Sequence, residues 1–283
     1  MKFKKTQIYF MTRLISSIIL FFFVLSHSFG QDLFNEENSS KFAEFLFKTQ
    51  QFNLAAQEYE RLVFLAPGNS NYKLSLLQSY RYSGDLTSAQ KKMIFFFGDS
   101  LFKINQTFGT EYLKLQILQG NLTEAQNYIR QNSRLDENVK DHYKTCIYLI
   151  GGDWKRADST INKSPHIDNQ LMGLTDKAMH LKHRKPALAA TFSLILPGSG
   201  KAYCGYWKDG LISLLFVSAN AWQTYRGYSK FGIKSTHFYF FTGLTAGFYI
   251  GNIYGSWKAA KRYNKKANDK IRHESENFIL STF

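Results

Sequence analysis

The sequence has little cysteine: Cys146 and Cys204 are the only two in 283 residues, and they lie far apart. Two such cysteines provide neither a disulfide framework nor a metal site. The sequence also lacks a local carboxylate pair, a nucleophile–base set and a metal-ligand cluster, and its seven histidines are scattered. We therefore expect a protein that is not an enzyme, with no catalytic residue, no cofactor, no metal ion and no small-molecule substrate.

Acidic residues are scarce at both ends of the chain. Residues 1–30 hold four basic and no acidic residues, and residues 182–283 hold fifteen basic and four acidic ones. The middle, residues 31–181, is neutral, so the net charge of +15 belongs to the ends. Because these cations flank apolar segments, they indicate loops next to an anionic lipid bilayer rather than a surface for nucleic acid.

A phosphate-binding loop is also excluded. Gly198-Ser199-Gly200-Lys201 resembles part of one, but the nucleotide-binding pattern needs a glycine at the position of Ile195 and Ser or Thr at the position of Ala202. The glycines of this stretch therefore predict a turn.

Residues 1–30 have the pattern of a secretory signal peptide. Four basic residues precede a twelve-residue apolar run, Leu14 to Leu25, and Ser28 and Gly30 supply the small residues that a signal peptidase requires. The alternative is an uncleaved anchor helix. Either interpretation places the following residues outside the cytoplasm, on the exported side of the inner membrane.

Residues 31–181 contain a repeat. A small residue follows a Gly-Asp or Gly-Asn turn and an apolar residue, and it recurs at spacings of 34, 36 and 32 residues. The first unit has Gln51 where glycine is usual. These repeat-signature residues are Ala55, Ala89, Ala125 and Ala157. Each unit predicts helix, tight turn, helix, with alanine allowing the two helices to approach.

This pattern resembles a tetratricopeptide repeat array. The resemblance implies a curved stack whose concave face binds a protein or peptide partner. Candidate partner-binding residues on the first helices of the units are Tyr72, Gln78, Tyr112, Gln116 and His142. The alternatives are a generic antiparallel helical bundle and ordinary packing at these five positions.

Residues 182–257 predict a membrane-embedded helical module. In the segment 237–256 glycine recurs every four residues among aromatic and aliphatic ones, at Gly243, Gly247, Gly251 and Gly255. Four glycines cost a helix in water about 1 kcal/mol each. In lipid, a ridge of this kind allows a second helix to approach, and the small residues of 211–225 are its expected partners. Asn220 and Asn252 are expected to form an amide pair between the two helices; the alternative is that they line a substrate path.

A turn motif precedes these two segments and follows the short apolar segment 186–196. It consists of Pro197, Gly198, Gly200, Tyr203, Gly205 and Gly210. The motif resembles small bacterial membrane modules of the two-transmembrane type or of unknown function. The resemblance implies membrane location but no activity.

The basic tail, residues 258–283, predicts an amphipathic helix on the inner leaflet. The positive-inside rule then favours an odd number of crossings, with the tail and the repeat on opposite sides of the membrane. The expected fold class is all-α, a solenoid of helical hairpins followed by a transmembrane module. The expected function is a membrane-anchored, non-enzymatic adaptor that binds a protein or peptide partner and no nucleic acid. The alternative is a component of membrane-protein biogenesis or transport.

Overall fold

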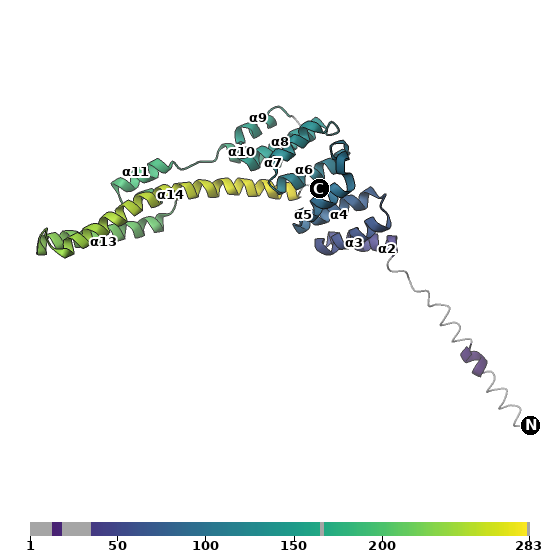
Figure 1. The fold of residues 1–283 in the computed structure, drawn as a ribbon, viewed down its shortest axis with the longest axis horizontal. Coiled ribbons are helices and arrows are strands. Elements are labelled where there is room, and N and C mark those ends of the chain that lie inside the picture. Colours follow the sequence, from purple (N-terminus) through teal and green to yellow (C-terminus); the bar gives the residue numbers. More distant parts are fainter. Residues whose placement is uncertain (1–12, 19–34, 165–166, 282–283) are drawn as a thin grey trace, which may run out of the picture. The chain divides into compact units, whose positions relative to one another are not determined.

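The computed structural model describes residues 13–18, 35–164 and 167–281, and the chain is all-α within these ranges, as predicted (Figure 1). Of the predicted signal peptide it describes only residues 13–18, which are helical; the rest lies outside the described residues. The chain divides into two compact units, residues 1–85 and 86–283.

Over its described residues 35–85, the first unit contains α2 (Glu36–Lys48), α3 (Phe52–Leu65) and α4 (Ser70–Ser83). The side chains of Asn35 and Asn69 accept hydrogen bonds from backbone N–H groups in the first turns of α2 and α4, which fixes where these helices begin. α3 packs against both neighbours, with Ala55 and Leu62 fully buried.

The second unit continues the series of short helices. They are α5 (Leu86–Phe97), the 3-10 helix η1 (Gly98–Lys103), α6 (Gln106–Leu118), α7 (Leu122–Gln131), α8 (Glu137–Gly151), α9 (Trp154–Ile161) and α10 (Asn169–Met179). Each helix from α5 to α10 packs against the next one along the chain, so paired helices pack sequentially. Of the predicted hairpins, α6–α7 and α8–α9 lie wholly in this unit, whereas α4 and α5 belong to different units.

Glycine forms the turns between paired helices because the backbone there is left-handed. Gly84, Gly120 and Gly152 have φ angles of 82°, 80° and 79°, a region that costs a residue with a Cβ about 1–2 kcal/mol. In the first hairpin this position is taken by Gln50, with φ of 61°. The residue that replaces the turn glycine is therefore Gln50, one position before the Gln51 expected from the sequence.

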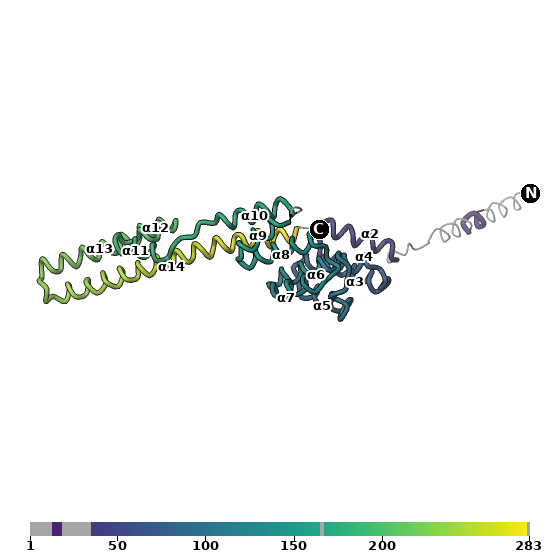
Figure 2. Tube along the Cα trace, turned by 90° about the horizontal axis from the view of Figure 1, so that it is seen from above, coloured from purple at the N-terminus to yellow at the C-terminus, as the bar shows by residue number. Residues whose placement is uncertain are grey.

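Four helices form the rest of the second unit: α11 (Pro186–Ile195), α12 (Ser199–Tyr203), α13 (Trp207–Phe231) and α14 (Thr236–Ser281). α11, α12 and α13 all pack against α14, and Figure 2 shows α13 and α14 running side by side as a hairpin. A small core joins them. It consists of Ala189, Cys204, Ala259 and Ala260, with Tyr203 and Tyr206 packed against it.

α14 is a single helix of 46 residues, so it is about 69 Å long. It continues without interruption through the predicted boundary at residues 257 and 258. Its first half pairs with α13, and its second half packs against α6, α8 and α10 (Figure 1). The basic tail is thus helical, as predicted, but part of its surface is covered by the repeat.

Candidate functional site

The four alanines of the repeat signature are all fully buried. Ala55, Ala89, Ala125 and Ala157 lie in the first turns of α3, α5, α7 and α9, the second helix of each predicted unit. α7 and α9 each pack against the preceding helix of the same hairpin. A larger side chain there would hold the two helices apart.

Two of the predicted partner-binding residues lie in the first unit and three in the second. Tyr72 and Gln78 are on α4 and are half-buried, and the Tyr72 hydroxyl donates a hydrogen bond of 3.1 Å to Glu36. Tyr112, Gln116 and His142 are on α6 and α8.

Tyr112 and Gln116 are held by neighbouring helices. The Tyr112 ring packs on Tyr128, with 4.5 Å between ring centroids, and burial raises the pKa of Tyr112 to about 12. The Gln116 amide donates to Gln90 at 2.8 Å and accepts from Asn121 at 3.0 Å. Both residues nevertheless border a cavity of about 630 Å³ between α5, α6 and α7.

His142 contacts the far end of α14. Its ring lies 5.6 Å from that of Phe278, and burial lowers the pKa of the imidazole. α6, α8 and α10 cover this end of α14. α6 and α8 are the first helices of the last two predicted pairs and so are among the helices expected to line the concave face, whereas α10 follows the last predicted pair. In this unit, the chain's own C-terminal segment therefore occupies part of the predicted partner-binding face.

The buried residues of that segment share one side of the helix. They are Ile271, Ser275, Phe278 and Ile279. An ion pair between Lys177 of α10 and Glu274, with 3.0 Å between Nζ and Oε2, adds to the contact. The tail therefore touches the repeat helices of this unit, a contact that the expected odd number of crossings did not anticipate. The number of crossings stays a prediction.

The glycines of the turn motif allow backbones to touch. A Cβ on Gly198 would overlap the backbone of Gly210, and a Cβ on Gly200 would overlap the carbonyl of Ala189. Gly205 has φ of 84°, and Pro197 ends the α11 segment just before the turn. Tyr203 packs on Phe192 with 5.3 Å between ring centroids, and its hydroxyl accepts a hydrogen bond from the Lys185 N–H at 3.4 Å.

A buried network of polar side chains fixes this turn on α14. Asn252 accepts a hydrogen bond from the Gly198 N–H at 3.0 Å and donates to the Ser193 carbonyl at 3.4 Å. The hydroxyls of Ser193 and Ser256 are 2.6 Å apart, and Ser193 also accepts from the Gly200 N–H at 3.0 Å. Buried polar groups need such partners.

The amide pair expected between Asn220 and Asn252 does not form. Asn220 donates to the Phe216 carbonyl of its own helix at 2.8 Å. Sequence reasoning missed Ser193 and Ser256 as partners of Asn252. The only available signal was a polar residue within each of two apolar segments, and such a residue does not identify its partner.

Three glycines of the α14 ridge have no close neighbour, and two of them, Gly247 and Gly251, border a cavity of about 240 Å³ beside α13. A Cβ on Gly243, Gly247 or Gly251 would have no atom within 4 Å, whereas at Gly255 it would lie 3.2 Å from Cε of Lys201. α13 packs on α14 through other residues, including a contact of 3.1 Å between the hydroxyls of Thr224 and Thr245. Close packing of the small residues of 211–225 on the ridge therefore stays a prediction.

Large apolar side chains of α13 and of the first half of α14 point outward. The exposed ones on α13 and on the first half of α14 are Trp207, Leu211, Ile212, Leu215, Phe216, Trp222, Tyr225, Tyr228, Phe231, Tyr239, Phe240, Phe248, Ile250 and Tyr254. By contrast, the buried apolar residues of 186–256 are Ala189, Cys204 and Val217. In the described part of the chain, however, no helix combines the length and the apolar character needed to cross a membrane. The predicted transmembrane helices are therefore not supported.

Both cysteines are free and buried, and burial raises the pKa of Cys146 to about 12. In the ranges that the structure describes, His, Cys, Asp and Glu form no group of three or more that could hold a metal ion.

Comparison of the chain with protein-family models, curated proteins and solved structures finds no match. The resemblances to tetratricopeptide repeats and to small bacterial membrane modules therefore stay predictions. Paired helices that pack sequentially are the part of them that the structure supports.

Proposed function

We propose that this protein is a membrane-associated, non-enzymatic scaffold. In this proposal the helical hairpins bind a partner protein or peptide, and α11, α13 and the first half of α14 contact lipid through their exposed apolar side chains. Contact with lipid along the sides of these helices does not require that any of them crosses the bilayer.

The main support for this proposal is that residues 186–256 expose large apolar side chains and bury small ones. Trp222 and Ile250 are 65% and 66% exposed, while the buried apolar residues there have small side chains apart from Val217. Soluble monomers rarely expose contiguous apolar patches larger than a few hundred Å². A protein with this surface needs a second apolar phase to cover it, and lipid is such a phase.

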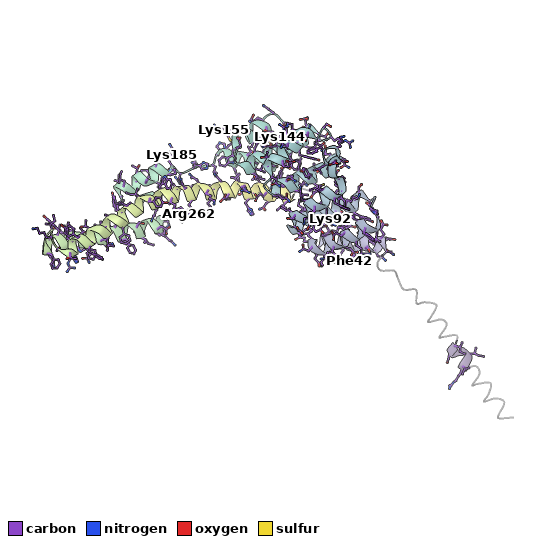
Figure 3. All side chains as sticks on the ribbon, in the orientation of Figure 1. Phe42, Lys92, Lys144, Lys155, Lys185 and Arg262 are labelled. Carbon is purple, nitrogen blue, oxygen red and sulfur yellow. The ribbon has the colours of Figure 1, made fainter. Side chains whose placement is uncertain are left out.

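Charge supports the same conclusion. Lysines and arginines border the apolar part at 182–185 and at 258–272, and again at 226–234. Figure 3 labels Lys185, just before α11, and Arg262 on α14 at one of these borders. Basic residues next to an apolar surface favour anionic lipid by about 1 kcal/mol each.

The proposal of a protein partner is supported by the repeat itself. Tyr112 and Gln116 border the cavity between α5, α6 and α7, together with Gln90, Asn121 and Glu124. Tyr112 and Gln116 are buried, whereas Asn121 and Glu124 are exposed and offer hydrogen-bonding groups suited to a peptide backbone. Export of the repeat is proposed from the signal-peptide pattern alone, and N-terminal sequencing of the mature protein tests it.

Vesicle flotation tests the proposed lipid contact. Wild-type protein is expected to float with vesicles that contain anionic phospholipid, and Trp222→Asp with Ile250→Asp to reduce the floated fraction several-fold. A matched control replaces two other highly exposed residues, Phe64 (84%) and Phe95 (82%), by Asp. The proposal fails if wild-type protein stays at the bottom of the gradient, or if both double variants lose flotation equally.

The alternative is a component of membrane-protein biogenesis or transport in which the glycine-bearing helices act directly. The open ridge of Gly243, Gly247 and Gly251 favours it, since a second helix could pack there. Co-purification in mild detergent separates the two functions. A single soluble partner supports the scaffold, and insertase or translocase subunits support the alternative.

A further inference from the structure

A second cavity lies where the apolar part of the chain meets its basic tail. Its volume is about 560 Å³, within the range of small-molecule sites. It is enclosed by the end of α10, the connection to α11, the turn between α12 and α13, and the middle of α14. The residues that border it are Lys177, Leu181, Cys204, Gly205, Tyr206, Tyr263, Lys266, Ala267, Lys270, Ile271 and Glu274.

The lining is apolar with a cationic border. Leu181, Ala267, Ile271 and the two tyrosine rings provide a surface for hydrocarbon. Three lysines and one glutamate provide the charges, and Glu274 is paired with Lys177 at 3.0 Å. Lys270 is 4.0 Å from Glu274, and among the described residues no carboxylate lies within ion-pair distance of Lys266. The cavity is therefore positively charged.

An arginine adds to this charge from the side. The Arg184 guanidinium lies over the ring of Tyr263, 5.4 Å from its centroid, and over Tyr203 at 4.8 Å. Asn264 holds the backbone of Arg184 in place by two hydrogen bonds, of 2.7 Å from the Arg184 N–H and 2.8 Å to its carbonyl. The Arg184 Nε is buried without a hydrogen-bond partner.

We infer that this cavity binds one anionic phospholipid. The phosphate group lies among Lys266, Lys270 and Arg184, and part of an acyl chain lies along the apolar lining. Its position, beside the exposed apolar helices, fits a ligand that has both a charged head and a hydrocarbon tail. The inference rests on the proposed lipid contact and adds to it a single, saturable site.

Calorimetric titration of the full-length protein in a mild non-ionic detergent tests this inference. The probes are dihexanoyl phosphatidylglycerol, dihexanoyl phosphatidylcholine and inorganic phosphate. We expect one site for phosphatidylglycerol, weaker binding of phosphatidylcholine because it carries no net charge, and no saturable binding of phosphate because it has no hydrocarbon. Lys266→Glu with Lys270→Glu is expected to weaken phosphatidylglycerol binding about tenfold or more.

The matched control is Lys258→Glu with Lys265→Glu, which makes the same change of charge on the same helix outside the cavity. It is expected to change the affinity by no more than about threefold, through long-range charge alone. The inference is overturned if the two double variants weaken binding equally, if the two lipids bind equally, or if phosphate binds as tightly as lipid. Vesicle flotation of the wild type would still succeed in these cases, so failure of the cavity site is distinguishable from failure of the lipid contact.

Discussion

At the scale of single residues, the glycines of the second unit fall into groups that differ in what a side chain would meet. Gly198, Gly200 and Gly210 face backbone atoms of neighbouring segments. Gly243, Gly247 and Gly251 face open space. A substitution is therefore expected to have opposite consequences in the two groups, although both lie in the same apolar part of the sequence.

Gly200→Ala is expected to destabilise the packing of α11, α12 and α14. The Cβ of the new alanine would overlap the carbonyl of Ala189. Because this carbonyl belongs to the backbone of α11, it cannot rotate out of the way as a side chain could. We expect a loss of about 2 kcal/mol or more in unfolding free energy. Thermal unfolding in mild detergent, followed by circular dichroism, measures it. Gly247→Ala is the control and should leave stability unchanged or raised, since alanine favours helix; equal losses would contradict the predicted difference.

Gln50→Gly is expected to stabilise the first unit. Gln50 has φ of 61°, and a residue without Cβ adopts this conformation at no steric cost. The free energy of unfolding should rise by about 1 kcal/mol. Urea unfolding measures it, with Gln51→Gly as the control because Gln51 has an ordinary φ of −84°. If only the Gln51 variant is stabilised, the assignment of the turn is wrong.

At the scale of elements, α14 performs two tasks along one continuous helix. Its first half presents apolar side chains outward beside α13, and its second half buries Ile271, Phe278 and Ile279 on the repeat. The second half therefore links the repeat to the apolar hairpin. His142 is one of the residues in this link: its ring contacts Phe278, and burial lowers the pKa of its imidazole.

The contact between the C-terminal segment and the repeat is expected to weaken in mild acid. The packed state disfavours protonation of His142, so the stabilisation is complete above the ordinary pKa of 6.5 and is lost as the pH falls below it. The charge of Asp168 opposes this shift, and that of Lys114 adds to it. Hydrogen exchange of residues 271–281 should be faster at pH 5.5 than at 7.5, after correction for intrinsic rates.

His142→Gln is the control for this pH dependence, because its side chain is polar but does not titrate. The protection of residues 271–281 in this variant should change little between the two pH values. An equal pH dependence in the variant and the wild type would show that another group is responsible.

At the scale of the whole molecule, the contact of α14 with α6, α8 and α10 restricts topology. Because they are in contact, we expect the basic tail and the second unit's repeat helices to lie on one side of any membrane. Reporter enzymes fused at Phe283 and after Lys182 are therefore expected to show that both points lie on the same side of the membrane. If the signal-peptide prediction holds, both reporters should indicate export. Opposite results for the two fusions would contradict the contact between the tail and the repeat.

Several features follow from local sequence. Ala125 and Ala157 recur after Gly120 and Gly152, and this local pattern was sufficient to predict helical hairpins and their turns. The apolar character of 186–256 and its basic borders were equally apparent, because both are properties of neighbouring residues. Periodicity and composition determine which segments are helical and which sides of them are apolar.

Only the tertiary structure decided which segments meet. It paired Asn252 with the turn at Gly198 instead of with Asn220, and it covered His142 with Phe278, 136 positions further along the chain. It also placed the close backbone contacts at Gly200 and left Gly247 open. These outcomes depend on the direction and length of helices that are distant in sequence, and a residue's own neighbours contain no information about such distances.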